Sequence, residues 1–280
     1  MVRKIFGAWL AFACGVSGTF GLPAAEPPWE VFVLVGQSNM DGRGQVAELS
    51  SNQVASARGS LIYYRNFKVA SAGWEPLRGG FSVPPGYRGG LPAPTFGPEL
   101  GFVARLRQEH PLARFALLKA TRGGTSLERD WRPGRPGEPA TMGPCFSNFL
   151  HAVREGTELL RQRGEPFVLR GILWHQGESD AADSVDVYQA KLSSLIQRMR
   201  EDLREPRLPF VVGEVYDNGK RDGVRQAQRA VAQQMPGVFF ASAENLNTWD
   251  KGTHFDASSQ WQLGERMAGA WHQGTLKIKP

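Results

Sequence analysis

The hydrophobic positions of this chain follow two alternating patterns. Short apolar runs rich in β-branched residues indicate buried strands, because a strand that is covered on both faces shows no polar side. Such runs cover residues 31–35, 114–119, 167–174, 209–215 and 238–243. Segments with apolar residues three and four positions apart predict helices. They cover residues 98–107, 148–161, 188–203, 223–234 and 257–271, with Asp256 as the N-cap of the last. Strands that alternate with helices predict an α/β fold, a three-layer α/β/α sandwich with a parallel sheet of flavodoxin-like character.

Two long segments rich in glycine and proline interrupt this alternation. They cover residues 66–97 and 130–144. Loops of this length are usually functional or disordered. Because both adjoin predicted strand ends, they either wall a binding cleft or form plain surface excursions. No internal repeat or interdomain linker is visible, so residues 26–280 are predicted to form one domain.

The amino end has the layout of a secretory signal peptide. Arg3 and Lys4 precede an apolar stretch at residues 5–16, and small residues follow up to Ala25. The apolar stretch is shorter than the ~20 residues that a membrane-spanning helix needs. A lipoprotein anchored at Cys14 is disfavoured, because the residues before it match that signal badly. The prediction is an exported protein, periplasmic or extracellular, with residues 1–25 removed and no membrane segment left.

Composition narrows the range of partners and cofactors. The apolar fraction of 41% and the charged fraction of 21% are typical of a soluble globular protein. The formal net charge is +6, and it becomes +4 without Arg3 and Lys4, since residues 1–25 contain no acidic residue. The basic residues are scattered, so no nucleic-acid partner is predicted. After cleavage Cys145 has no second cysteine to pair with, and no metal-ligand motif is visible, so neither a disulfide nor a cofactor is expected.

Polar clusters follow the predicted strands or precede the last helix. They cover residues 36–44, 120–126, 174–180 and 250–255, and Ser38 lies in the first. Because the carboxyl ends of parallel strands meet along one edge of a sheet, these clusters should share one site. Together they supply a serine, a pair of glycines, a glutamine, carboxylates and two histidines.

This set of residues suits acyl transfer. Ser38 could attack an ester carbonyl while a histidine takes its proton and returns it to the leaving alcohol. The negative oxygen that forms needs preorganised donors, such as the backbone N–H of Ser38, a glycine N–H and the side-chain amide of Gln176. A carboxylate would hold the histidine in the correct tautomer.

The same clusters, GQSNM and WHQGESD above all, carry a family resemblance over residues 29–272. The chain resembles the SGNH/GDSL hydrolase superfamily, and within it the sialate O-acetylesterase-like branch that includes the acetyl xylan esterases of carbohydrate esterase family six. The resemblance implies that Ser38 is the nucleophile and His254 the base. It also implies that Gly124 and Gln176 complete the oxyanion hole with Ser38, with Gly123 as the alternative glycine.

The resemblance does not decide which of two acidic residues supports the histidine. The superfamily usually has aspartate three residues before the histidine, but Lys251 stands there and Asp250 lies one residue earlier. Glu178 of the HQGE segment is the alternative, and the departure in spacing puts Glu178 slightly ahead.

Four other polar residues in these clusters have predicted roles. Gln37 and Gly123 are expected to contact substrate, and Arg122 either anchors the substrate or pairs with Glu128. His175 is interpreted as structural because it continues a buried strand.

The predicted activity is that of an exported serine esterase that removes acetyl groups from carbohydrate. The resemblance implies that the substrate is acetylated xylan, sialic acid or a related glycan. Trp74, Tyr87 and Trp131, if exposed, could stack on sugar rings. Two alternatives stay open: a carbohydrate-binding protein without catalysis, and a lipase or thioesterase of the same superfamily. The oligomeric state does not follow from the sequence.

Overall fold

The five predicted strands lie side by side in one sheet. The structure, a computed structural model, describes residues 26–83, 94–250 and 252–278. Its main sheet has the strand order β4-β3-β6-β1-β7-β8-β9, and every neighbouring pair is parallel except β3 and β4. These strands are β1 (Trp29–Gly36), β3 (Leu61–Arg65), β4 (Glu75–Pro76), β6 (Arg114–Thr121), β7 (Phe167–His175), β8 (Phe210–Gly213) and β9 (Val238–Ala241). A separate antiparallel pair joins β2 (Gly44–Gln45) to β5 (Thr95–Phe96).

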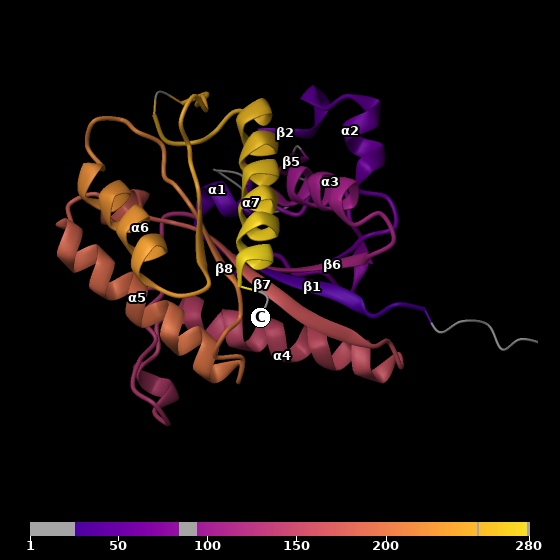
Figure 1. Ribbon diagram of the computed structural model, residues 1–280, viewed down its shortest axis with the longest axis horizontal. Helices are drawn as coiled ribbons and strands as arrows, with labels where there is room; N and C mark the ends of the chain where they lie inside the picture. The colour runs from indigo at the N-terminus through magenta and orange to yellow at the C-terminus, as the bar shows by residue number, and fades with distance from the viewer. Residues whose placement is uncertain (1–25, 84–93, 251, 279–280) are drawn as a thin grey trace, which may run out of the picture.

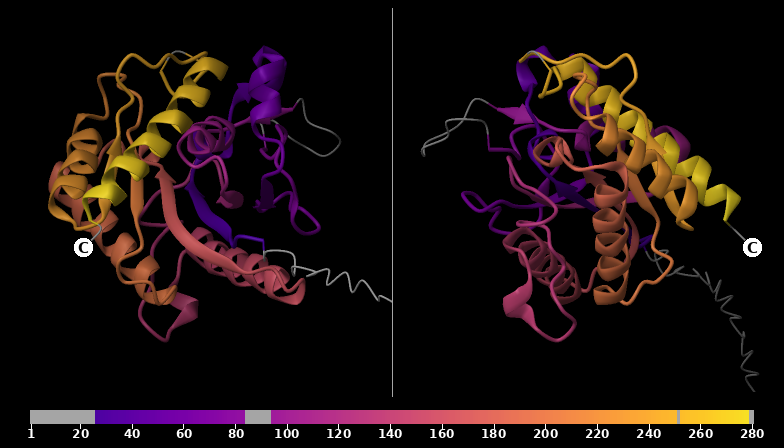
Figure 2. Two further views of the ribbon diagram at one scale, coloured as in Figure 1. Left: turned by 45° about the vertical axis from the view of Figure 1, so that its right-hand side comes forward. Right: turned by 90° about the vertical axis from the view of Figure 1, so that its left-hand side faces the viewer.

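Helices cover both faces of the sheet, as predicted (Figures 1 and 2). Alternate residues of β1 enter two apolar cores: Val33 belongs to one and Phe32 to the other. The core around Val33 is closed by α4 (Pro144–Gln162), α5 (Val185–Asp202) and α6 (Asp222–Gln234), and the core around Phe32 by α3 (Glu99–Glu109) and α7 (Ala257–Lys277). The helices α1 (Ser38–Asp41) and α2 (Ser51–Ser56) are short. The N-cap of α7 is Asp256, whose side chain accepts a hydrogen bond from the Ser259 N–H, so this prediction is confirmed.

The sequence did not predict β3, although β3 is an inner strand of the sheet. Four of its five residues are aliphatic or aromatic, and periodicity alone does not separate so short a run from other buried segments. With β3 included, the parallel strands numbered in chain order read 2-3-1-4-5-6, whereas flavodoxin has 2-1-3-4-5. The three-layer arrangement is therefore the predicted one, but the third parallel strand, β6, lies between the first and the second.

The central position of β1 brings three polar clusters to one row. Gly36, the last residue of β1, lies opposite Thr121 of β6 on one side and His175 of β7 on the other. The chain turns sharply at this row, and Gly36 has a φ of 146°. A Cβ on Gly36 would lie 2.1 Å from the His175 carbonyl oxygen, so the turn into Ser38 requires glycine.

A buried ion pair ties β6 to α3, and the same ammonium group also reaches α1. The Nζ of Lys119 donates to Glu99 Oε2 at 2.8 Å, to the Asp41 carbonyl at 2.7 Å and to the Phe81 carbonyl at 2.9 Å. Both charged side chains are fully buried. All three donors of the ammonium group are thereby used, which is the condition under which a buried cation is tolerated.

Replacing Lys119 with methionine is expected to destabilise the fold, because Glu99 would keep a buried charge without its partner. We expect the free energy of unfolding to fall by about 3–5 kcal/mol, measured by urea denaturation. The double variant Lys119→Met/Glu99→Gln, which removes both charges, should recover part of this loss. A single variant within about 1 kcal/mol of the wild type would show that the pair contributes little.

Two further predictions concern the amino end and the remaining cysteine. The signal peptide at residues 1–25 lies outside the described residues, and no helix in the described part of the chain is long and apolar enough to cross a membrane. Cys145 is unpaired and buried at the start of α4. Burial raises the pKa of its thiol to about 12, which keeps the thiol protonated at neutral pH.

Candidate active site

Ser38 lies at the point where the central strand passes into a helix. It is the first residue of α1, two positions after the end of β1. The first N–H groups of a helix have no partner within the helix, and the Ser38 N–H makes no backbone hydrogen bond among the described residues. The strand and the short helix therefore present both the hydroxyl and the backbone N–H of Ser38 at the same edge of the sheet.

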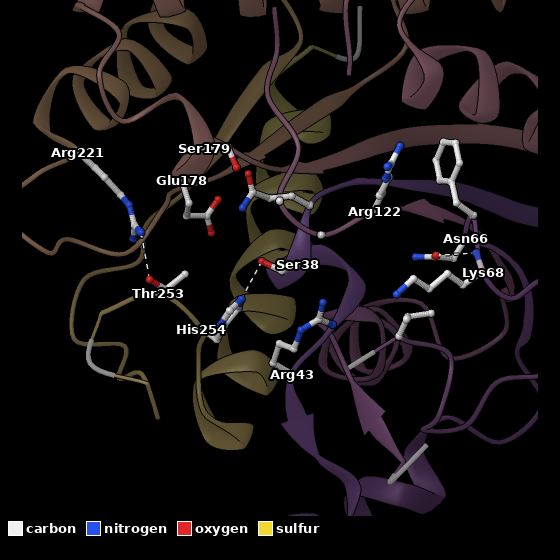
Figure 3. A pocket seen from close by; sticks show the side chains of 15 residues that line it. Ser38, Arg43, Asn66, Lys68, Arg122, Glu178, Ser179, Arg221, Thr253 and His254 are labelled. Atoms are coloured by element: carbon white, nitrogen blue, oxygen red, sulfur yellow. Dashed lines mark hydrogen bonds between the residues drawn. The ribbon is translucent and has the colours of Figure 1, made fainter. Parts of the chain in front are cut away.

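A hydrogen-bonded chain links Ser38 to His254 and Asp250. The Ser38 Oγ lies 3.0 Å from His254 Nε2, and the His254 Nδ1 lies 2.5 Å from Asp250 Oδ2. Since a carboxylate only accepts, Nδ1 carries the proton, which leaves Nε2 free to accept from the serine hydroxyl. Figure 3 shows His254 and Ser38 pointing toward each other in a shared cavity.

The turn before α7 explains why Asp250 reaches the histidine from four positions away. Its Oδ1 accepts hydrogen bonds from the backbone N–H groups of Thr253 and His254, at 3.0 and 2.7 Å. Partial burial raises the pKa of Asp250, but the hydrogen bonds from the backbone and the ring of His254 outweigh this effect. The pKa of Asp250 therefore lies below its usual value, and the group is a carboxylate at neutral pH.

Asn39, next to the nucleophile, holds this turn in place. Its side-chain oxygen accepts from the Phe255 N–H at 3.1 Å, and its amide donates to the Thr253 carbonyl at 2.9 Å. These two bonds bracket His254 on both sides. No role was predicted for Asn39, although its position directly after Ser38 was an available signal.

Glu178 does not contact His254, although the sequence slightly favoured Glu178 over Asp250 as the acid that supports the histidine. Its Oε1 accepts from the Asn39 amide at 2.6 Å and lies 3.8 Å from His175 Nδ1. The reason is positional: Glu178 follows β7, and Asn39 lies between it and the His254 turn. In this structure Asp250 is thus the carboxylate that orients His254.

Of the two glycines, Gly123 lies nearer to the nucleophile. A Cβ on Gly123 would lie 3.5 Å from the Cβ of Ser38, whereas a Cβ on Gly124 would meet nothing within 4 Å. Both glycines line the cavity. Gly123, the alternative that the sequence left open, is therefore the glycine that adjoins Ser38.

Gln176 is not free to complete an oxyanion hole. Its amide nitrogen donates to the Thr125 carbonyl at 2.8 Å and to the carboxylate of Asp180, and its oxygen accepts from Tyr188 at 3.1 Å. Gln176 is fully buried and does not line the cavity. Because both N–H groups are engaged, the expectation that Gln176 donates to the reacting oxygen is not met here.

The cavity above Ser38 measures about 710 Å³. Asn66, Phe67, Lys68 and Val83 of the first glycine- and proline-rich loop line it, so this loop forms part of the cleft wall. The second loop lines a different groove, beside α5. The remaining lining residues are mostly polar or charged: Gln37, Ser38, Arg43, Arg122, Gly123, Gly124, Glu178, Ser179, Arg221, Thr253 and His254.

Three other residues of the predicted site keep distinct positions. Gln37 lines the cavity, and its side-chain oxygen is buried without a partner. Arg122 packs over the Phe67 ring at 4.5 Å, while Glu128, its other predicted partner, pairs with Lys191. His175 is fully buried with Nε2 on the Glu214 carbonyl; burial lowers its pKa, which supports a structural role.

The exposed aromatic rings differ from those the sequence suggested. Trp74 and Trp131 are buried, and Tyr87 lies outside the described residues. Trp249 is 55% exposed, and its ring stacks on His254 at 5.8 Å between centroids. Phe67 is also exposed, on the cavity wall. The surfaces that remain open for stacking on a sugar are therefore those of Trp249 and Phe67.

The comparison with protein families agrees with this geometry. A family model described as "carbohydrate esterase, sialic acid-specific acetylesterase" matches residues 28–273. The chain belongs to this family. A probable carbohydrate esterase of Arabidopsis thaliana is 28% identical over 260 residues, which cover 88% of this chain and 91% of the plant protein. The predicted esterase class is thereby confirmed.

Solved structures share the fold of this carbohydrate esterase. The X-ray structure of an Arabidopsis thaliana protein has a TM-score of 0.69 at 24% identity and covers 88% of this chain and 99% of its own. NanS has a TM-score of 0.64 at 16% identity, with 90% and 99% covered. A carbohydrate acetylesterase from Xanthomonas citri has a TM-score of 0.57 at 18% identity, with 90% and 57% covered. At these identities the likeness concerns the fold alone.

Proposed function

We propose that this carbohydrate esterase is an exported serine hydrolase that removes O-acetyl groups from a glycan through an acyl-enzyme intermediate. The observation that carries the proposal is the hydrogen-bonded chain from Ser38 through His254 to Asp250. Export rests on the signal-peptide layout of residues 1–25.

The geometry gives each group a step. Ser38 Oγ attacks the acetyl carbonyl carbon, its proton passes to His254 Nε2, and the carbonyl electron pair moves onto the oxygen. Collapse of the tetrahedral intermediate expels the sugar hydroxyl, which takes the proton from His254. A water molecule, deprotonated by His254, then attacks the acyl carbon. The bond from that carbon to Ser38 Oγ breaks, Oγ takes the proton back from His254, and acetate leaves. Asp250 keeps Nδ1 protonated and stabilises the imidazolium that forms twice in the cycle.

We place the negative oxygen next to the Ser38 N–H and the Gly123 N–H. Both residues lie at the same edge of the sheet, and Gly123 is the glycine nearer to Ser38. Backbone donors held by a helix start and a strand end need little reorganisation when the charge develops.

The cavity wall supports a short acyl group and a polar leaving group. Phe67 and Val83 are its only large apolar lining residues among those described. An octanoyl chain would need a continuous apolar groove, whereas a sugar needs hydrogen-bonding partners and an exposed aromatic face. The observed wall favours the sugar, and so disfavours the lipase and thioesterase alternatives. Acetylated xylan and acetylated sialic acid are the two substrate classes to test first.

Acetate release from acetylated xylan, from O-acetyl sialic acid and from p-nitrophenyl acetate tests this proposal directly. We expect turnover of p-nitrophenyl acetate and of at least one acetylated glycan, and p-nitrophenyl octanoate should be a markedly poorer substrate than the acetate. A protein that binds the glycans and releases no acetate would instead support the non-catalytic alternative. Preference for the octanoate would support the lipase alternative.

A further inference from the structure

A buried arginine follows the nucleophile motif and reaches the same cavity. Arg43 is only 6% exposed, yet it lines the cavity beside Ser38 and His254 (Figure 3). A Cβ built on Gly123 would lie 3.2 Å from the Nη2 of Arg43 and 3.5 Å from the Cβ of Ser38. The guanidinium and the nucleophile therefore converge on the glycine that we place at the negative oxygen.

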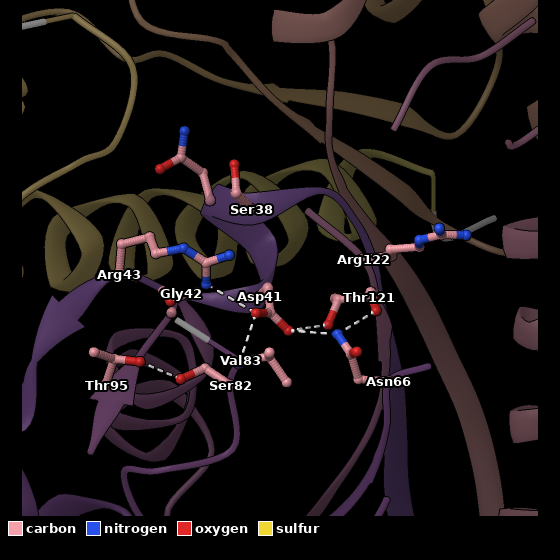
Figure 4. A network of polar contacts seen from close by, with 12 residues as sticks. Ser38, Asp41, Gly42, Arg43, Asn66, Ser82, Val83, Thr95, Thr121 and Arg122 are labelled. Atoms are coloured by element: carbon pink, nitrogen blue, oxygen red, sulfur yellow. Dashed lines mark hydrogen bonds and ion pairs between the residues drawn. The ribbon is translucent and has the colours of Figure 1, made fainter. Parts of the chain in front are cut away.

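The orientation of Arg43 is held by a buried carboxylate. Its Nη1 donates to Asp41 Oδ2 at 2.8 Å and to the Gly42 carbonyl at 2.5 Å. Asp41 is itself held by the Thr121 hydroxyl at 2.6 Å and by the Val83 N–H at 2.8 Å (Figure 4). The Tyr64 hydroxyl also donates to Asp41, at 2.7 Å. Burial raises the pKa of Asp41, but the Arg43 and Lys119 cations outweigh it and keep the pKa below its usual value. The ionised Asp41 carboxylate thus fixes the guanidinium through Nη1.

Two nitrogens of Arg43, Nη2 and Nε, have no hydrogen-bond partner within the described residues, and Nε is buried. The third nitrogen, Nη1, makes both bonds that anchor the side chain. Gln176, the expected side-chain donor of the oxyanion hole, has both N–H groups occupied. The oxyanion site therefore lacks the expected side-chain donor. Arg43 places a charged donor at the edge of the sheet where Ser38 lies.

We propose that Arg43 is a catalytic residue, whose Nη2 donates to the carbonyl oxygen as that oxygen becomes negative. The inference rests on the proposed acyl transfer and names the third donor of its oxyanion site. The arginine gives up no proton: the electron pair of the carbonyl π bond moves to oxygen, and the serine proton goes to His254. A guanidinium is always charged at working pH and forms short hydrogen bonds to anions, so the bond strengthens as the negative charge develops.

The test compares Arg43→Gln with the wild type on p-nitrophenyl acetate and on an acetylated sugar. We expect kcat to fall by about 10²–10³-fold with KM changed far less, because the bond forms mainly in the transition state. An alkylboronic acid, which adds to a serine hydroxyl as a tetrahedral anion, should lose affinity for the variant by a similar factor. Arg43→Lys, which keeps the charge, should recover part of both losses.

Controls separate this role from a structural one. Arg129→Gln removes an exposed arginine and should match the wild type in kcat and in inhibition by the boronic acid. If Arg43→Gln fails to fold, Asp41→Asn/Arg43→Gln, which removes both buried charges, takes its place in the same assays. A folded variant whose kcat stays within about threefold of wild type, or whose loss lies in KM alone, overturns the assignment. Failure of the wild type to hydrolyse any acetyl ester would overturn the proposed function instead.

Discussion

The Ser38→Ala variant is expected to lose about 10⁶-fold in kcat on p-nitrophenyl acetate, the loss that follows removal of the serine from a comparable triad. The size of the effect follows from the mechanism, because without Oγ no acyl-enzyme forms and the remaining groups act only on bound water. The fold should survive, since the Oγ of Ser38 makes one hydrogen bond, to His254, among the described contacts. Unfolding temperature and kcat should be measured on the same preparation.

A matched serine tests the specificity of that result. Ser147 is exposed on α4, and Ser147→Ala should keep the wild-type rate. A fluorophosphonate probe should label the wild type on Ser38 and leave the Ser38→Ala variant unlabelled. Residual turnover of the Ser38→Ala variant above about one per cent would show that another group is the nucleophile.

The Asp250→Asn variant should lose about 10⁴-fold in kcat, because an amide no longer holds His254 in the tautomer that accepts from Ser38. Asparagine preserves the volume of the side chain and retains an oxygen for the backbone bonds of the turn, so the fold should be kept. Since the pKa of Asp250 is lowered, the wild-type residue is ionised throughout the neutral range, and the loss should be similar at all pH values above about 6.

Glu178→Gln is the matched comparison, because it neutralises the other carboxylate near the site. Glu178 contacts Asn39 and not His254, so its loss in kcat on p-nitrophenyl acetate should be smaller than that of Asp250→Asn by at least tenfold. The reverse order of effects would identify Glu178 as the acid that supports the histidine. Equal losses in both variants would show that the two carboxylates act as one unit.

Five of the strands and the row of polar clusters could be read from the sequence. A strand buried on both faces is easy to recognise in a sequence, because it forms a nearly continuous apolar run. Five such runs were visible. The strand that was missed, β3, is short and lies beside loops rich in glycine and proline. Its place in the sheet depends on pairing with β6, a contact between residues far apart in the chain.

The choice among polar neighbours within the site could not be read in the same way. Glu178 and Asp250 both belong to polar clusters that were predicted to share a site with His254. Only the direction of each side chain decides which carboxylate contacts the histidine. The aspartate is turned toward the histidine by two backbone N–H groups, whereas the glutamate is held by Asn39. Gln176 has the right residue type, but Thr125 and Asp180 take up its hydrogen bonds.

The sequence by itself determined the fold class and the nucleophile candidate Ser38, because strand patterns and residue types at strand ends are local properties. The base candidate His254 came from the family resemblance of the sequence motifs. The tertiary structure decided which carboxylate orients the histidine, which glycine adjoins the serine, and that Arg43 enters the cavity. These depend on the partners that each polar group finds across the fold. A buried hydrogen-bonding group pairs with the partner that packing brings next to it. Which partner that is depends on contacts between residues far apart in the chain, so it cannot be predicted from local sequence patterns.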